Sequence, residues 1–302
     1  MRSGIRDEPA SEGIVFRILP AGRLRWLSSH PAIAVLDVGF VKHPDLPARR
    51  VIACRDVTGR RVVPFRYGDP RSFAEHGTRT MLLAAGDGHG SGLVSPSPRG
   101  RVVLVKVGQG HRVPRQAIVR AFRWVLARGA AYGIRVVLCP FGDDPERRGE
   151  RSEIPSLVRA LDERRIVVVA AAGWDPEGAC VSPASSPHAI GVGGWDVEAK
   201  RPARGPRVGV VGGVLKPDLL APAVPLVVPS MDGRHQEKAG GTSFAASLVA
   251  GAALALVSKD PRLDREGVLV LFTGAARRIP GQPPALDLRA LFRLGIPVRR
   301  AD

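Results

Sequence analysis

Gly240-Gly241-Thr242-Ser243-Phe244-Ala245-Ala246-Ser247-Leu248-Val249-Ala250-Gly251 is the stretch that decides the fold. Its two leading glycines allow a tight turn, and Thr242 and Ser243 then stand where a helix begins. The small and apolar residues that follow predict a buried helix over residues 245–256. A serine at the start of a helix lies beside free main-chain N–H groups, which favour negative charge developing nearby. Ser243 is therefore a candidate nucleophile for a reaction that passes through an oxyanion, and the alternative is a serine that caps a core helix.

Composition limits the class of protein. The chain has 302 residues, of which 44% are hydrophobic, and no apolar run approaches the roughly 20 residues that a membrane span needs. The first ten residues are polar and lack the apolar core of a secretory signal, so we expect a cytoplasmic protein without a membrane partner. Cys54, Cys139 and Cys180 are too few and too far apart for a disulfide framework or a metal-ligand spacing. We see no acidic cluster that would bind calcium, and we expect no metal and no cofactor.

The net charge of +17 comes almost entirely from arginine. A basic chain suggests a nucleic-acid partner, but here the arginines are scattered in ones and twos, and aromatic residues make up only 5% of the chain. No dense basic tract and no row of aromatic residues for stacking bases is present. We therefore expect no specific nucleic-acid binding, and favour an acidic partner surface or a preference for acidic substrates.

Short apolar runs alternate with longer helical patterns along the chain. Branched apolar residues at 32–36, 102–107, 136–138 and 166–170 are typical of buried parallel strands. The helices expected between and after them cover residues 79–85, 114–128, 154–164, 265–272 and 286–294. This alternation predicts a mostly parallel sheet covered by helices on both faces. We expect one domain over residues 32–294, an N-terminal extension over 1–31 and a tail over 295–302.

Three residues that suit acyl-transfer chemistry stand at the ends of predicted elements. Asp37 follows the first core strand, His76 stands at the start of a helix, and Ser243 stands at the start of another. Attack on an acyl carbon needs a hydroxyl, a base that takes its proton, and a carboxylate that orients the base. Each residue has a structural alternative, because Asp37 could cap a turn and both His76 and Ser243 could cap helices.

Taken together, the motifs resemble those of the subtilisin-like serine proteases. Val35-Leu36-Asp37-Val38-Gly39 with His43-Pro44-Asp45-Leu46 resembles the aspartate block of that family, and His76-Gly77-Thr78 with Ala84-Ala85-Gly86 resembles its histidine block. The Ser243 stretch resembles the serine block, and Lys216-Pro217-Asp218 with Ala221-Pro222 resembles the segment that usually precedes it. The blocks come in the family's order and cover about residues 32–294.

The resemblance implies a three-layer α/β fold with a mostly parallel seven-stranded sheet. It implies that Ser243 is the nucleophile, His76 the general base and acid, and Asp37 the carboxylate that orients His76. It further implies that an extended peptide binds as an added strand between two chain edges, with these contact positions: Val107, Gly108, Pro140, Phe141, Gly142, Ala172 and Gly173. Pro140 has no N–H to donate to such a peptide. Asp143, Asp144 and Glu146 follow this edge, which suggests a basic side chain in the first substrate pocket.

The chain departs from the family pattern at the oxyanion position. The family usually has asparagine after an Ala-Ala-Gly run, and here Ala171-Ala172-Gly173 is followed by Trp174. The side-chain amide that would stabilise the oxyanion is therefore absent, and the main-chain N–H of Ser243 remains. Two interpretations of Trp174 stay open: its indole N–H could donate instead, or the ring turns away and packs against a loop.

These observations give one leading hypothesis and two alternatives. The leading one is a serine endopeptidase of low or conditional activity that acts on a peptide or protein substrate. The first alternative is a degenerate member that binds peptides or a partner without turnover, as the loss of the oxyanion asparagine suggests. The second is a protease that matures one dedicated precursor peptide. The sequence leaves no room for a long inhibitory segment before Asp37, so a regulatory partner protein is a further expectation.

Overall fold

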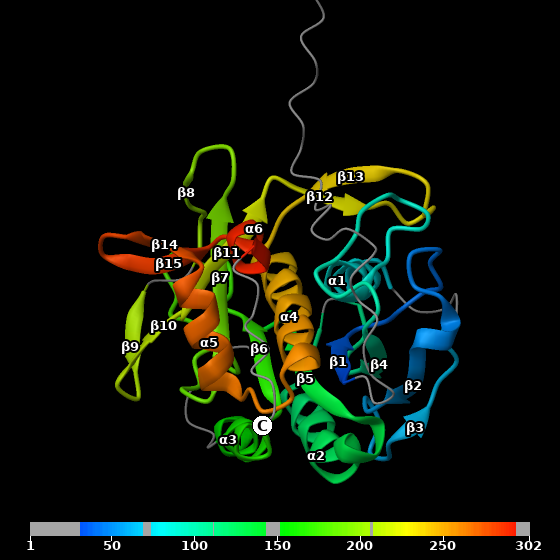
Figure 1. Cartoon of the computed structure of the whole chain (residues 1–302). Coiled ribbons are helices and arrows are strands. Elements are labelled where there is room, and N and C mark those ends of the chain that lie inside the picture. Colours follow the sequence, from blue (N-terminus) through cyan, green and yellow to red (C-terminus); the bar gives the residue numbers. More distant parts are fainter. Residues whose placement is uncertain (1–30, 69–73, 111, 143–151, 206–207, 294–302) are drawn as a thin grey trace, which may run out of the picture.

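The computed structural model describes residues 31–68, 74–110, 112–142, 152–205 and 208–293, and Figure 1 shows their arrangement. The predicted tail and nearly all of the predicted N-terminal extension lie outside these residues. So do Asp143, Asp144 and Glu146, on which the expectation of a basic first pocket rests.

A mostly parallel sheet forms the centre of the described chain. Seven of its strands follow one another in parallel, in this order across the sheet: β2 (Val51–Asp56), β4 (Arg101–Lys106), β1 (Ala32–Asp37), β5 (Ile134–Cys139), β6 (Val167–Ala171), β7 (Ala189–Asp196) and β11 (Leu219–Val224). The parallel sheet that the sequence predicted is confirmed. Within the described residues it extends to eleven strands.

The additional strands lie at the edges of this parallel block. β15 (Gln282–Leu286) adds in parallel to β11, whereas three short strands pair antiparallel: β3 (Val63–Pro64), β8 (Arg201–Pro202) and β14 (Ala276–Ile279). Two hairpins stand apart from the sheet, β9–β10 (Gly209–Val211, Val214–Lys216) and β12–β13 (Leu226–Pro229, Gln236–Ala239). The second hairpin leads directly into the Ser243 stretch.

Helices cover both faces of the sheet, as predicted. The side chains of β1 alternate between two cores, with Ile33 and Val35 on one face and Ala34 and Leu36 on the other. The first core packs against these helices: α1 (Glu75–Ala85), α4 (Thr242–Lys259), α5 (Arg265–Gly274) and α6 (Leu288–Arg293). The second packs against α2 (Arg115–Tyr132) and α3 (Ile154–Glu163). A single turn of 3₁₀ helix, Ala48–Arg50, precedes β2.

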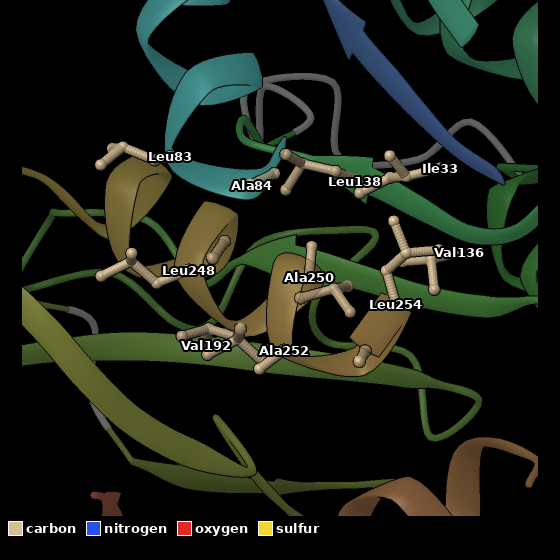
Figure 2. Close-up of a cluster of buried hydrophobic side chains, with 14 of the residues drawn as sticks. Ile33, Leu83, Ala84, Val136, Leu138, Val192, Leu248, Ala250, Ala252 and Leu254 are labelled. Carbon is tan, nitrogen blue, oxygen red and sulfur yellow. The ribbon is translucent and has the colours of Figure 1, made fainter. Parts of the chain in front are cut away.

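The central helix α4 is largely buried, although its last residue, Lys259, is exposed. Its length and its mean hydropathy of 1.4 would suit a membrane span, but 78% of it is covered by the rest of the protein, as in the core helix of an α/β domain. Figure 2 shows Leu254 and Ala250 of α4 facing Val136 and Leu138 of β5.

Helices α1 and α4 lie side by side and run parallel. The ring of His76 near the start of α1 stacks on that of Phe244 near the start of α4, while Ala84 near the end of α1 meets Gly251 of α4. A Cβ on Gly251 would lie 2.4 Å from the carbonyl oxygen of Ala84, so only glycine allows this close approach. The packing therefore places the beginnings of both helices at the same edge of the sheet.

Candidate active site

Asp37 is the last residue of β1, and its side chain is 2% exposed. One oxygen, Oδ1, accepts the main-chain N–H of Val38 at 2.8 Å, and the other, Oδ2, accepts the hydroxyl of Thr80 at 3.0 Å. Both oxygens lie 3.0 Å from Nδ1 of His76. A buried carboxylate is tolerated because these donors satisfy it, and they also hold it in one orientation toward His76.

His76 belongs to the first turn of α1, which starts one residue earlier at Glu75. The next residue, Gly77, explains how the helix comes so close to β1. A Cβ there would lie 2.2 Å from the carbonyl oxygen of Gly39 and 2.9 Å from Cβ of Asp37. Because only a hydrogen atom fits, the glycine after the histidine is a packing requirement of the Asp37–His76 contact. Helix α1 has Ala74 as its N-cap, so the capping alternative for His76 is wrong.

The protonation equilibrium of His76 results from opposing effects. Burial favours the neutral ring and lowers its pKa, whereas the charge of Asp37 and the hydrogen bond to it raise the pKa. The Arg79 guanidinium, also on α1, lowers it slightly. The effects of Asp37 together outweigh the rest, so the pKa of His76 is raised above its ordinary value of 6.5.

A pH dependence follows for any reaction that needs neutral His76 as a base. We expect the acid limb of the kcat/KM profile to have its midpoint above pH 6.5, because a raised pKa keeps the ring protonated to higher pH. Arg79→Gln removes a cation that lowers the pKa, so the midpoint should move to still higher pH. Peptide hydrolysis measured from pH 5 to 9 tests this, and a midpoint at or below pH 6.5 in the parent protein would contradict it.

Ser243 is the second residue of α4 and brings the third group to the same edge. Its hydroxyl donates to the carbonyl oxygen of Pro140, just beyond the end of β5, at 2.7 Å. The capping alternative is wrong, because Gly241 (φ 150°) is the N-cap of α4. Within the described residues no hydrogen bond joins Ser243 to His76, whose ring stacks on the adjacent Phe244 at 5.9 Å between centroids. With Nδ1 turned to Asp37, Nε2 is the ring nitrogen left for the serine.

The start of α4 also offers a main-chain donor. The N–H of Ser243 has no partner among the described residues, as expected for the second residue of a helix. The side chain of Thr242 donates to the carbonyl oxygen of Gly173 at 3.1 Å, which fixes the Gly173–Trp174 segment beside the helix start. This is the region where a substrate oxyanion would need donors.

Trp174 itself is 40% exposed. Its ring atom Cζ3 would lie 3.5 Å from a Cβ on Gly194, so this part of the indole lies against strand β7. Its N–H makes no hydrogen bond to another described residue. Both interpretations of Trp174 therefore stay open, because the indole N–H is without a partner among the described residues and the ring lies against Gly194.

The predicted peptide-binding positions lie around this edge. Val107 continues from β4 and is buried, and Gly108 packs with its α-carbon against the carbonyl group of Arg112. Pro140 is buried and Phe141 and Gly142 are partly exposed, with Gly142 against Val181. Ala172 is buried, and its N–H and carbonyl are already paired with Val192 and Val181, whereas Gly173 is partly exposed. The main-chain groups of Ala172 are therefore already used within the protein, which leaves Gly173 as the predicted peptide contact of this segment.

Sequence reasoning missed several residues that build the site. Thr80 holds Asp37 in place, and its position four residues after His76 puts both on one face of α1. Phe244 supports the ring of His76. Arg79 forms ion pairs with Glu75 at 2.6 Å and with Glu237 of β13, which joins α1 to the hairpin before the serine. No motif marks Glu237, because its partner is 158 residues away in the sequence.

These features define a three-layer α/β protein with an aspartate, a histidine and a serine at the carboxyl edge of its parallel sheet. The sequence profile of the Subtilase family matches residues 28–287. The chain belongs to the subtilase family.

Individual relatives agree with this assignment. Serine protease AprX of Bacillus subtilis is 28% identical over 293 residues, covering 83% of this chain and 62% of AprX. Subtilisin Savinase of Lederbergia lenta is 28% identical over 246 residues, covering 80% of this chain and 82% of Savinase. An alkaline protease of Alkalihalobacillus alcalophilus, also 28% identical, is covered over 58% of its length. The chain thus spans about six-tenths of AprX and of this alkaline protease.

Solved structures show the same fold. S41 psychrophilic protease has a TM-score of 0.69 at 24% identity, covering 82% of this chain and 83% of its own. The prenylagaramide maturation protease PagA has a TM-score of 0.67 at 18% identity, covering 87% of this chain and 93% of its own. At these identities the likeness concerns the fold.

Proposed function

We propose that this subtilase is a serine endopeptidase whose nucleophile is Ser243. The observation that carries the proposal is the buried Asp37 carboxylate, held by Val38 and Thr80 and bonded through both oxygens to His76. A carboxylate fixed in this way orients an imidazole and stabilises its cation, which is what a serine nucleophile needs from its base.

The proposed reaction has two stages. Ser243 Oγ turns from Pro140, transfers its proton to Nε2 of His76 and bonds to the carbonyl carbon of the scissile peptide. His76 then returns the proton to the departing amine as the C–N bond breaks, which leaves an acyl-enzyme on Ser243. Water attacks the acyl carbon with His76 as base again, so that the acid product leaves and Ser243 regains its proton.

We expect the activity to be low, because one oxyanion donor is missing. The N–H of Ser243 is free to serve, but the asparagine amide found in the family is replaced by Trp174. Removing that amide from subtilisin itself lowers turnover about 100- to 1,000-fold, and we take this magnitude from there. Weak intrinsic activity, or activation by a regulatory partner protein, follows from the same deficit.

Covalent labelling tests the proposal most directly. A fluorophosphonate reacts only with a serine that its base activates. We expect the parent protein to be labelled and both Ser243→Ala and His76→Ala to remain unlabelled, with Ser258→Ala, a serine on the same helix, as the matched control. No labelling of folded parent protein would refute the proposal and favour the second candidate, a scaffold that binds peptides without turnover, for which Trp174 is the supporting observation.

Restoring the oxyanion amide should raise the activity. In Trp174→Asn the main chain stays fixed by the Thr242–Gly173 hydrogen bond, so the new amide lies beside the start of α4. We expect kcat to increase about 100-fold. Trp174→Leu is the control, because it removes the indole and supplies no donor. Equal rates for the two variants would show that Trp174 does not occupy the oxyanion position.

The substrate is a further part of the proposal. PagA, a protease of similar fold, is the prenylagaramide maturation protease, and the protease domain of PatA also has this fold. We propose as an alternative that this chain matures one dedicated precursor. Incubation with generic peptide libraries and with candidate acidic precursors distinguishes the two, since a dedicated enzyme leaves the libraries uncut.

A cytoplasmic location belongs to the proposal as well. Cys54, Cys139 and Cys180 are all free, which suits a reducing compartment. Cell fractionation of the native host tests this, and recovery of the protein outside the cytoplasm would refute it.

A further inference from the structure

An open groove lies against one end of the sheet, where strands β7, β11, β15 and β14 follow one another. It has a volume of about 760 Å³ and runs between the end of β7, the β14–β15 hairpin and α6. Figure 1 shows these elements together, with α6 and the hairpin beside β11. We call it the basic groove and define it by Trp195, Lys200, Pro222, Arg277, Arg289 and Arg293.

Among the described residues, the cations of the basic groove have neither an ion-pair partner nor a side-chain hydrogen bond. Lys200, Arg277, Arg289 and Arg293 are exposed, and none forms an ion pair or a side-chain hydrogen bond with another described residue. The acid among the described lining residues, Asp287, uses Oδ1 to accept the N–H of Ala290 at the start of α6. Positive charge on the groove is therefore left in excess, and walls of low polarity strengthen its field.

Many arginines elsewhere in the chain are engaged. Arg55, Arg120 and Arg135 each donate to main-chain carbonyl oxygens, and Arg265 donates to Asp162. The groove cations thus differ from arginines that serve the fold, since they contribute charge without a structural contact. An arrangement of this kind suits the carboxylates of an incoming ligand.

The floor of the groove is apolar. Half-buried Trp195 lies beside Pro222, its register partner on β11, and Ala285 and Leu286 of β15 continue the surface. An aromatic ring and aliphatic side chains on a groove floor suit apolar side chains of a ligand, while the cations of the groove suit acidic ones. This combination fits a peptide that carries both kinds of side chain better than it fits an inorganic anion.

A main-chain hydrogen bond connects the groove to the segment that carries the proposed nucleophile. Pro222 lines the groove, and the carbonyl oxygen of the next residue, Ala223, accepts the N–H of Gly241, two residues before Ser243. One main-chain hydrogen bond therefore links a strand that lines the groove to the segment that carries Ser243.

We propose that the basic groove binds an acidic segment of the polypeptide substrate, in which glutamate or aspartate residues alternate with apolar ones. This proposal deepens the proposed protease function and rests on it, because the bound segment is part of a substrate only if the protein cleaves peptides. The groove would select the substrate by its acidic segment, at a distance from the bond that is cut.

Direct binding tests the proposal apart from catalysis. The probe is a fluorescein-labelled peptide in which glutamate alternates with leucine, measured by fluorescence anisotropy on Ser243→Ala protein at low salt. Its glutamine counterpart controls for apolar binding. We expect the glutamate peptide alone to bind, and Arg277→Glu combined with Arg289→Glu to weaken it about tenfold or more.

Arg278→Glu combined with Arg159→Glu is the matched control. Arg278 neighbours Arg277 on β14 but faces a second hollow, and Arg159 is an exposed residue of α3. Equal weakening by this control would show a response to net charge only and would overturn the proposal. A second result would also overturn the proposal. In it, the glutamate peptide fails to bind, whereas a labelled oligonucleotide binds the parent protein and not the groove variant. Fluorophosphonate labelling of the Arg277→Glu, Arg289→Glu variant with Ser243 intact reports the reactivity of the nucleophile separately. Loss of peptide binding in the groove and loss of protease activity can therefore be told apart.

Discussion

Asp37→Asn is expected to lower kcat about 10⁴-fold while the protein remains folded. The magnitude is that known for the aspartate of the catalytic triads of serine proteases, subtilisin included. The reason here lies in the donors around the carboxylate. An asparagine has one oxygen and one NH₂ group, and the surroundings of Asp37 decide which way it faces.

The main-chain N–H of Val38 points at Oδ1 and can only donate, so the asparagine oxygen must take that position. The NH₂ group then takes the position of Oδ2, beside the Thr80 hydroxyl and Nδ1 of His76. The hydroxyl can rotate and accept, because it has a second acceptor in the carbonyl oxygen of Gly77. The NH₂ group at the Oδ2 position opposes an N–H on Nδ1 of His76 and favours the tautomer that carries its proton on Nε2, where the ring can no longer take a proton from Ser243.

Steady-state hydrolysis and fluorophosphonate labelling rate, both measured beside urea unfolding, check this prediction. Asp56→Asn is the matched control, because Asp56 also ends a parallel strand of the sheet but forms its ion pair with Lys106, at 3.9 Å. We expect the control to change kcat less than about twofold. An Asp37→Asn protein that retains a tenth of the parent's activity would mean that Asp37 does not set the tautomer of His76.

The sequence predicted the sheet and the three acyl-transfer candidates because each signal is local. A branched apolar run followed by Asp37, or a Gly-Thr-Ser sequence followed by an apolar helix, needs only neighbouring residues to be recognised. The contact between Asp37 and His76 is then a consequence of packing, because Gly77 and Gly251 allow α1 to lie against β1 and α4.

Other features depend on contacts that no local pattern contains. Helix α2 continues through Gly129 to Tyr132, although the glycine predicts its end, because Gly129 packs against Val125 and Ile134 and because Gly133 (φ 68°) provides the C-cap. Strand β11 escaped prediction because Pro222 argues against a central strand. The Pro140 carbonyl that accepts from Ser243, and the basic groove, bring together residues that are distant in the sequence.

The buried ion pair before β11 gives the prediction with the largest expected effect on stability. Lys216, 0% exposed, donates through Nζ to Asp218 at 2.6 Å and to the carbonyl oxygen of Ala189 at 2.9 Å. Asp218 also accepts the N–H of Gly191 at 2.6 Å. Burial lowers the pKa of Lys216 and raises that of Asp218 despite their mutual attraction, so desolvation outweighs the gain from pairing.

Lys216→Met should therefore lower the free energy of unfolding by about 3–5 kcal/mol, because it leaves the Asp218 carboxylate buried without a cation. The loss should depend on pH in a defined direction. Since burial holds the folded pKa of Asp218 above its ordinary 3.8, the carboxyl is protonated and harmless below that value, and the deficit grows as the pH rises through the folded pKa. Urea unfolding of parent and variant at several pH values measures it, with exposed Lys238→Met as the control.

Adding Asp218→Asn to Lys216→Met should recover most of the lost stability. The asparagine oxygen can still accept the Gly191 N–H, and no buried charge remains, so the double variant should unfold within about 1 kcal/mol of the parent. A double variant as unstable as Lys216→Met would mean that the lysine acts through packing of its side chain and not through the charge of Asp218. Recovery would show that the Lys216–Asp218 pair is not needed for the free energy of unfolding. The role left for the pair would then be to fix the geometry between β7 and β11.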